Sequence, residues 1–245
     1  MISDHRNRED FSRFLVHLTR DYDGSTAQDN LVSMLRQRRV EARSAHCLFA
    51  PKIKNIGFSN VLKKQFNTVC LTEVPLNQLR FLTQEIPKRK IELKPFGLVF
   101  RKTHLLDEGA NPAIYVNSKA AGLRELLLSQ FDQHFEEVRQ YRHFKKAYGQ
   151  DADAIIRYYA LINIISEHMD FTWEREWRFK GDLSFDFDRL VAIIASDPKA
   201  FRRKVAVEFG RKFQQEIESI PVISPEWNYE QLVEEMTFRI WESRG

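Results

Sequence analysis

The pattern of apolar and polar positions predicts a strand at residues 14–19, where apolar side chains dominate and polar ones interrupt them. The polar, glycine-containing stretch 21–24 follows as a turn. A helix is expected next, because Ser25 or Thr26 can cap it and apolar residues within 31–35 recur at helical spacing. Further short elements are expected as strands at 40–49, 68–71, 97–100 and 113–116 and as a short helix around 76–83.

From Lys119 to Tyr148 apolar residues recur every three or four positions, which is the period of an amphipathic helix. A second helix is expected after Gly149, with an apolar stripe that reaches Ile165. The two helices together predict a helical insertion at 119–170 between strands. Beyond it, we expect a buried strand at 190–194, a helix from Ser196 or Pro198 to about 208, and a helix at 229–241.

The composition is that of a globular protein: 43% of the 245 residues are apolar and 29% are charged. No repeat or linker is evident, so we expect one domain over 1–245. The net charge of +4 is compatible with an anionic partner. Two cysteines match no metal spacing and suit a reducing compartment. The first residues lack the apolar core of a secretory signal, and the run 158–165 is too short to span a bilayer. We therefore expect a cytoplasmic protein with no metal site and no membrane contact.

The stretch 173–179 carries the clearest candidate chemistry. In a strand, Glu174 and Glu176 would share one face, where two carboxylates repel each other. Either a basic partner neutralises them, for which Arg175 and Arg178 are candidates, or the strand lines a polar cleft where a carboxylate takes part in chemistry.

A second set of residues lies near the N-terminus. His17-Leu18-Thr19, followed by Asn30-Leu31, resembles the opening of DarT-type nucleic-acid ADP-ribosyltransferases and of the AbiGi abortive-infection family. The segments that resemble later AbiGi blocks are 70–76, 96–100, 109–115 and 174–178. The resemblance implies an α+β, ADP-ribosyltransferase-like fold, with a mixed or antiparallel sheet core and a helical insertion. It also implies that NAD is a substrate.

The resemblance implies a role for each matching residue. Glu176 would accept a hydrogen bond from a ribose hydroxyl and stabilise the positive charge that develops as nicotinamide leaves, while Glu174 would guide the nucleophile or act as base. The residues assigned to NAD binding are His17, Thr19, Asn30 and Tyr115. The family pattern also has an arginine for the NAD phosphates, and the candidates for that position are Arg43, Lys63 and Lys64.

Two functions follow from this interpretation. The first is an effector of phage defence or of a toxin–antitoxin system that transfers ADP-ribose to a nucleic acid, with protein as the less favoured acceptor. The second is an inactive binding module of the same fold that serves as antitoxin or regulatory subunit beside a partner protein. In the second case the two carboxylates are structural or contact the partner. Without the resemblance, His17 is interpreted as a core residue, and Thr19 and Asn30 as residues that serve the turn and the helix start. The basic clusters that would bind phosphates if they converge are 36–39, 63–64, 88–90, 145–146, 202–204 and 211–212.

Overall fold

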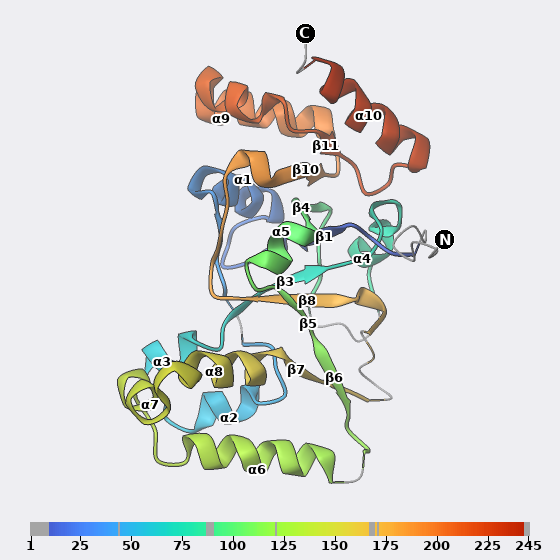
Figure 1. Ribbon diagram of the computed structural model, residues 1–245. Coiled ribbons are helices and arrows are strands. Elements are labelled where there is room, and N and C mark those ends of the chain that lie inside the picture. Colours follow the sequence, from blue (N-terminus) through green and yellow to red (C-terminus); the bar gives the residue numbers. More distant parts are fainter. Residues whose placement is uncertain are drawn as a thin grey trace, which may run out of the picture. The chain divides into compact units, whose positions relative to one another are not determined.

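The computed structural model describes residues 10–43, 45–86, 91–120, 122–166, 170 and 172–242 (Figure 1). The chain divides into two compact units, each described by itself below. The first unit holds the chain up to Arg39, Leu71–Glu108 and the chain from Ser184 onward, and the second holds Val40–Cys70 and Gly109–Leu183. The strands located where the chain passes from one unit into the other are β2 (Arg39–Val40), β3 (Thr68–Thr72) and β9 (Leu183–Ser184).

The first unit is built on a mostly antiparallel sheet. Its strands are β1 (Phe14–Leu18), β4 (Phe96–Arg101), β10 (Leu190–Ala195) and β11 (Val222–Ile223). They lie in the order β11-β10-β4-β1, and the end of β3 pairs with β1. Among these described strands, β10 and β11 pair in parallel and the other pairs are antiparallel. The predicted strands at 14–19, 97–100 and 190–194 are thereby confirmed.

The helices of the first unit are α1 (Ala27–Gln37), α4 (Arg80–Thr83), α5 (Lys102–Asp107), α9 (Pro198–Glu218) and α10 (Tyr229–Glu242), with 3-10 turns at Leu76–Gln78 and Phe187–Arg189. Thr26 is the residue that caps α1, since its hydroxyl accepts from the amide of Asp29. The helix from Pro198 reaches the predicted end near residue 208, because the backbone leaves helical geometry at Gly210, whose φ is 74°. A second helical segment of α9 follows the kink and ends at Glu218. In Figure 1, α9 and α10 lie against β10 and β11.

The core of the first unit forms where this sheet meets its helices. One cluster of buried side chains in this core comprises Val16, Leu18, Val74, Leu79, Leu82, Val99, Ala192, Ile194, Ile223 and Leu232. Burial of so many aliphatic side chains is the main stabilising contribution to this unit. Gly97 belongs to the same sheet, and a Cβ at this position would lie 2.3 Å from the carbonyl oxygen of His17. The close approach of β4 to β1 therefore requires glycine.

The second unit is richer in helices. Its helices are α2 (Ala50–Asn55), α3 (Asn60–Lys64), α6 (Leu123–Phe135), α7 (Tyr141–Tyr148) and α8 (Ala152–Leu161), with 3-10 turns at Gly149–Asp151 and Thr172–Glu174. Its strands are β5 (Asn111–Pro112), β6 (Ile114–Asn117), β7 (Ile162–Ile165) and β8 (Glu176–Lys180). β8 lies between the start of β3 and β5, whereas β6 and β7 form a separate parallel pair.

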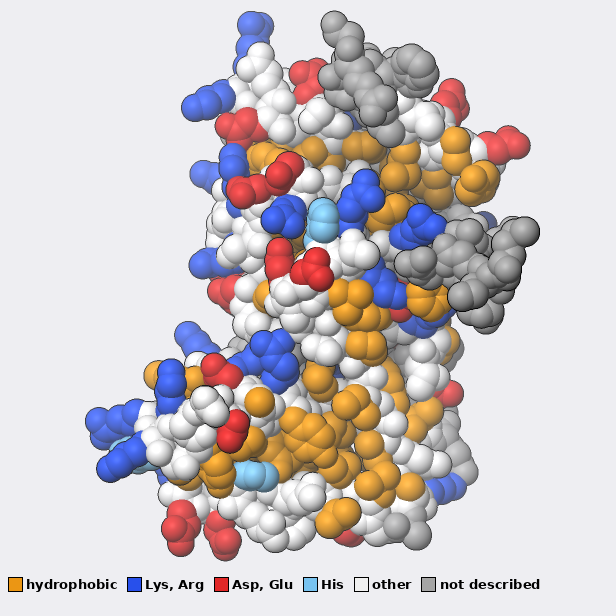
Figure 2. Space-filling view, viewed as in Figure 1, with side chains coloured by type: hydrophobic (Ala, Val, Ile, Leu, Met, Phe, Trp, Pro, Cys, Tyr) orange, Lys and Arg blue, Asp and Glu red, His pale blue; other side chains and the backbone are white. Residues whose placement is uncertain are grey.

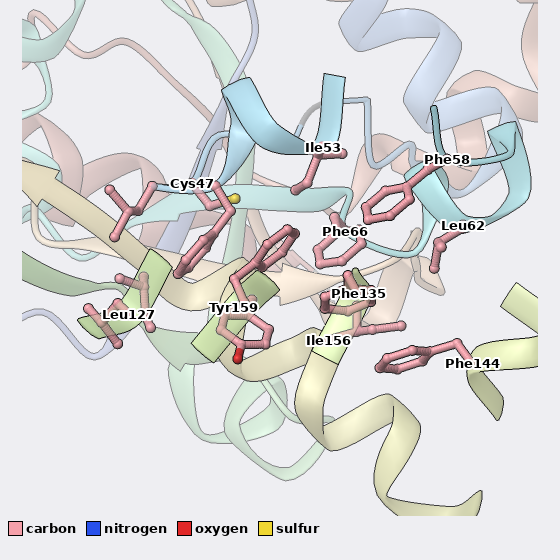
Figure 3. Close-up of a cluster of buried hydrophobic side chains, with 14 of the residues drawn as sticks. Cys47, Ile53, Phe58, Leu62, Phe66, Leu127, Phe135, Phe144, Ile156 and Tyr159 are labelled. Atoms are coloured by element: carbon pink, nitrogen blue, oxygen red, sulfur yellow. The ribbon is translucent and has the colours of Figure 1, made fainter. Parts of the chain in front are cut away.

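An aromatic cluster holds the second unit together (Figure 3). Phe131 stacks on Phe49 with ring centroids 4.8 Å apart, and Phe135 stacks on Phe144 at 4.5 Å. All four of these rings have no exposed surface. Stacked and edge-on aromatic pairs add to the stabilisation that burial alone supplies. The helices α2, α6 and α7 are therefore fixed to one another by interlocking rings.

Three sequence-based predictions are wrong in this part of the chain. The helix expected over 119–148 is two helices, because the chain leaves α6 after Phe135 and α7 begins at Tyr141. Residues 162–165 form β7 and not the end of a helix, so the insertion at 119–170 contains a strand. The strand expected at 40–49 is confined to Val40, since the described residues from 41 to 49 are irregular.

The architecture is a mixture of helices with a mostly antiparallel sheet, as the sequence predicts. The ADP-ribosyltransferase-like fold within that class stays a prediction. None of the helices among the described residues combines the length and the apolar character needed to cross a bilayer.

Candidate functional site

The site is centred on Glu176, the first residue of β8. Glu174 does not share a strand face with it, because Thr172–Glu174 is a 3-10 turn and Arg175 has a φ of 49°. The left-handed residue turns the chain between the two glutamates. The predicted strand over 173–179 therefore begins three residues later than expected, and the expected repulsion across one pleated face does not arise.

Arg178 is the basic partner of Glu176. Two residues apart on one strand, their side chains project to the same side. The Arg178 Nε donates to Glu176 Oε1 at 2.9 Å and its Nη2 donates to Oε2 at 3.2 Å, so the guanidinium grips both oxygens. Its Nη1 donates to the carbonyl oxygen of Ala160 at 2.6 Å, and the side chain has no exposed surface. The guanidinium is thus held from two directions.

Two further side chains reach Glu176 from the parallel pair β6–β7. Tyr115 and Asn163 are direct partners in the register of these strands. The Tyr115 hydroxyl donates to Glu176 Oε2 at 2.9 Å, and Asn163 Nδ2 makes a longer contact of 3.4 Å to the same oxygen. The short parallel pair therefore supplies two donors at one point, and both point to the same carboxylate oxygen.

The charge state of Glu176 follows from these contacts. Burial raises the pKa of its carboxyl, but the charge of Arg178 and hydrogen bonds from Arg178, Tyr115 and Cys70 outweigh burial, so the pKa is lowered below its usual value. For Arg178, burial lowers the pKa of the guanidinium, yet the facing Glu176 makes the net shift upward. The two groups are consequently a stable ion pair at neutral pH.

Cys70 and Tyr115 are held in their protonated forms around this pair. Burial, with the charge of Glu176 second, raises the pKa of the Cys70 thiol to about 12. Burial, and then the same carboxylate, raises the pKa of Tyr115, and Glu174 adds to this rise. A thiol with such a pKa is a poor nucleophile, so Cys70 acts here as a donor to Glu176. Glu174 is close enough to act electrostatically on Tyr115.

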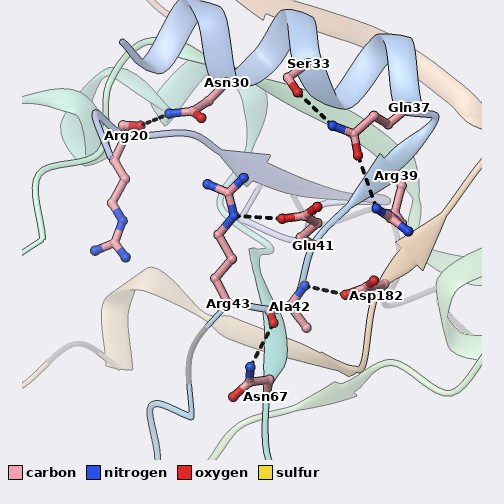
Figure 4. A network of polar contacts seen from close by, with 10 residues as sticks. All are labelled: Arg20, Asn30, Ser33, Gln37, Arg39, Glu41, Ala42, Arg43, Asn67 and Asp182. Atoms are coloured by element: carbon pink, nitrogen blue, oxygen red, sulfur yellow. Dashed lines mark hydrogen bonds and ion pairs between the residues drawn. The ribbon is translucent and has the colours of Figure 1, made fainter. Parts of the chain in front are cut away.

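The N-terminal candidates belong to the first unit. Thr19 is buried, and its hydroxyl donates to the carbonyl oxygen of Ala27 at 2.9 Å. Asn30 is also buried, and its Nδ2 donates to the carbonyl oxygen of Arg20 at 2.9 Å (Figure 4). His17 is half-buried near the end of β1, opposite Leu98 of β4. Thr19 and Asn30 thereby fasten the turn between β1 and α1, as their structural interpretation requires.

The six predicted site residues fall into two groups. Glu174, Glu176 and Tyr115 lie in the second unit, where the structure brings Glu176 and Tyr115 into contact; His17, Thr19 and Asn30 lie in the first. Of the candidates for the NAD phosphates, Arg43 is paired with Glu41 at 3.2 Å (Figure 4), and Lys63 and Lys64 end α3. The choice among the three stays a prediction.

Asn163 and Cys70 are contacts that sequence reasoning did not find. Asn163 is the one polar residue in the run Ile162–Ile165, and a lone amide among isoleucines is a signal of a buried hydrogen-bond partner. Cys70 gives no comparable signal, since a cysteine in an apolar strand is ordinarily a core residue. Within the part of the chain that the structure describes, no group of three or more His, Cys, Asp or Glu side chains is arranged to hold a metal ion.

Comparisons with protein-family models, with curated proteins and with solved structures found no match for this chain.

Proposed function

We propose that the protein transfers ADP-ribose from NAD to a nucleic acid, as an effector of phage defence or of a toxin–antitoxin system. The observation that supports this best is the carboxylate of Glu176, which Arg178 and Tyr115 hold ionised and fixed in orientation. A preorganised negative charge is what a developing positive charge at a sugar carbon needs. The resemblance of 174–178 to the last AbiGi block points to the same residue.

In the proposed reaction the bond between the ribose C1 and the nicotinamide nitrogen breaks, and its electron pair leaves with nicotinamide. C1 becomes oxocarbenium-like, and a nucleophilic atom of the acceptor then forms the new bond. The proton that the nucleophile loses passes to a carboxylate. Glu176 would stabilise the charge at C1, while Tyr115 would line the site of the planar nicotinamide.

The contacts of the two glutamates indicate a different chemical role for each. Glu176 is a weak base, because its pKa is lowered and both of its oxygens accept hydrogen bonds. Glu174 is half-buried at the end of a turn, and it is the carboxylate proposed to accept the proton that the nucleophile loses. The 3.4 Å contact of Asn163 is longer than those of Tyr115 and Arg178 to Glu176, so a ribose hydroxyl would replace it at a lower cost than either of these.

His17, Thr19 and Asn30 are proposed to serve NAD binding, and their contacts in the structure decide which of them would bond NAD directly. Thr19 and Asn30 already donate to backbone carbonyls, so both are proposed as positioning residues that set the course of the chain after β1. His17 is then the residue of this group proposed to bond NAD. NAD enters the reaction as a substrate, so no resident cofactor is required.

The test is transfer of label from NAD to mixed DNA, RNA and protein acceptors by the purified chain. Glu176→Gln should abolish transfer, and Glu174→Gln should reduce it while leaving the Arg178 pair intact. Since Glu176→Gln leaves a buried guanidinium without its counter-charge, circular dichroism must show that this variant is folded at the assay temperature. Normal transfer by folded Glu176→Gln would overturn the catalytic assignment.

A second candidate function is a non-catalytic module that acts as antitoxin or regulatory subunit. The observation in its favour is that Glu176 is satisfied by protein donors alone, which is the pattern of a structural ion pair. Expression without a partner separates the two functions. A transferase should arrest growth and Glu176→Gln should restore it, whereas a binding module should permit growth in both forms.

A further inference from the structure

The outward side of α7 carries four basic residues and is named here the α7 basic face. Its members are Arg142, His143, Lys145 and Lys146, and all four are exposed. Between them, Phe144 points the other way into the aromatic cluster and has no exposed surface. Figure 2 shows basic side chains gathered at the edge of the second unit where α7 lies. The helix is therefore anchored by one ring and presents its cations to solvent.

These cations are not those that stabilise the fold. Elsewhere in the second unit Lys52 pairs with Asp132 at 2.6 Å, and Lys180 pairs with Asp153 at 3.0 Å. Among the described residues, Arg142, Lys145 and Lys146 make no ion pair within 4.0 Å. Lys145 acts electrostatically on Asp153, whose pKa it helps to lower after hydrogen bonds from Lys180 and Tyr141. Asp153 is thus already engaged by other groups.

The helix dipole accounts for part of this arrangement but not all of it. Lys145 and Lys146 lie in the last turn, where positive charge is favourable. Arg142 lies in the first turn, where positive charge is unfavourable, and α7 has no acidic residue in that turn. Arg142 and Lys146 are also one turn apart on the helix, so these like charges repel each other. The face carries a repulsion that an anionic partner would relieve.

A neighbouring helix extends the positive surface. The amide of Ser59, which caps α3, donates to the carbonyl oxygen of Arg139 at 2.9 Å, just before α7. Leu62 of α3 and Phe144 of α7 belong to the same cluster and lie at one end of it (Figure 3). Lys63 and Lys64 follow Leu62 directly, so two of the predicted basic clusters flank the same part of the second unit. Two exposed glutamates, Glu136 and Glu137, directly follow α6.

We infer that the α7 basic face binds the phosphate backbone of a nucleic acid, with Arg142, Lys145 and Lys146 as the phosphate contacts and Lys63 and Lys64 beside them. Cations on one short, rigid helix match the regular negative charge of such a backbone. The inference rests on the proposed function and deepens it, because it names α7 as the element that holds the nucleic-acid acceptor.

The test is binding of a fluorescein-labelled single-stranded oligonucleotide to the full chain, without NAD, across a range of salt concentrations. Each phosphate contact adds about 0.7 to the slope of log affinity against log salt, so Lys145→Ala/Lys146→Ala should lower the slope by roughly 1.4. Between about 50 and 200 mM salt this is roughly a sevenfold difference in the loss of affinity. Lys145→Arg/Lys146→Arg should keep the parent slope.

The matched control is Arg211→Ala/Lys212→Ala, which removes two adjacent exposed charges from α9 in the first unit. An equal loss of slope in both alanine pairs would overturn the inference, because it would show a net-charge effect. Absence of oligonucleotide binding by the parent, or binding only to vesicles of phosphatidylserine, would overturn it as well. Slope loss confined to the α7 pair, in a protein that transfers no label from NAD, would support the surface and refute the transferase.

Discussion

At the scale of single residues, Glu176 and Arg178 form a buried, doubly hydrogen-bonded ion pair in the second unit. The guanidinium has no exposed surface and the carboxylate side chain is 14% exposed, so neither charge is solvated well by water. Such a pair has a large desolvation cost, and its value lies in fixing geometry more than in adding stability. The same contact that fits a catalytic carboxylate also makes the site sensitive to acid.

The acid sensitivity gives a prediction about pH. The folded pKa of Glu176 is lowered from its usual 4.5, so the stability it contributes is complete above that value and is lost as pH falls through the folded pKa. Glu176→Gln lacks this contribution. We expect the difference in urea midpoint between the parent and Glu176→Gln to be largest near about pH 7 and to shrink toward about pH 3.

The control for this experiment is Glu230→Gln, an exposed glutamate in the first turn of α10. Its midpoint should follow that of the parent at every pH. A constant difference between the parent and Glu176→Gln across the whole range would show that the carboxylate is not ionised by its partners.

The residue-level contacts were predictable in part. Side chains in a strand alternate between its two sides, so residues 176 and 178 lie on the same side. Once the start of the strand is known, this favours Arg178 over Arg175 as the partner of Glu176. The sequence left the two arginines open because the left-handed turn at Arg175 has no glycine to signal it. Asn163 could not be assigned to Glu176, because that contact depends on the pairing of β6 with β7.

At the scale of elements, the N-cap of α1 could be predicted from the sequence to within one residue. The sequence allowed Ser25 or Thr26, and the structure places the cap at Thr26, whose hydroxyl also contacts the Asp29 carboxylate at 2.6 Å. Loss of a capping side chain costs about 1 kcal/mol. We expect Thr26→Ala to lower the free energy of unfolding by about that amount, and Ser25→Ala to leave it nearly unchanged, as measured by urea denaturation.

The reverse result, with Ser25→Ala the more destabilising change, would move the helix start by one residue. Both variants lie at the start of α1, directly after the turn that follows His17 and Thr19. Their free energies of unfolding therefore also show how much this turn contributes to stability.

Element boundaries were harder to predict where the apolar period continues across a break. Nothing in the composition of 136–140 stops a helix, yet α6 ends there because Arg139 folds back and donates to the carbonyl oxygens of Phe135, Glu136 and Val138. Likewise, isoleucines at 162–165 suit either a helix or a strand. Their β-branched side chains favour the strand, and pairing with β6 decides the matter.

At the scale of the whole molecule, the division into two units could not be predicted from the sequence. Each unit is assembled from separate segments of the chain, and no change of composition or flexible linker marks the crossings at Arg39, Cys70, Glu108 and Leu183. Whether the chain also forms one ADP-ribosyltransferase-like domain stays a prediction. What the structure does show is that each unit has an apolar cluster made from its own residues.

Separate clusters imply that damage to one core acts first on its own unit. Phe135 contacts Phe131 at 4.7 Å and Phe144 at 4.5 Å between ring centroids, so Phe135→Ala removes a central ring of the second cluster. Such a truncation costs about 3–5 kcal/mol. In hydrogen–deuterium exchange we expect the amides of α6 and α8 to lose protection more than those of β4 and β10.

Val99→Ala provides the matched change in the first cluster, and it should reverse the pattern by exposing β4 and β10 more than α6 and α8. If each substitution raised exchange equally in both units, the two clusters would unfold together, and the α7 basic face would then share the stability of the strand that carries His17. Opposite patterns would instead show that the surface inferred to bind nucleic acid has its own stability, set by the aromatic cluster beneath it.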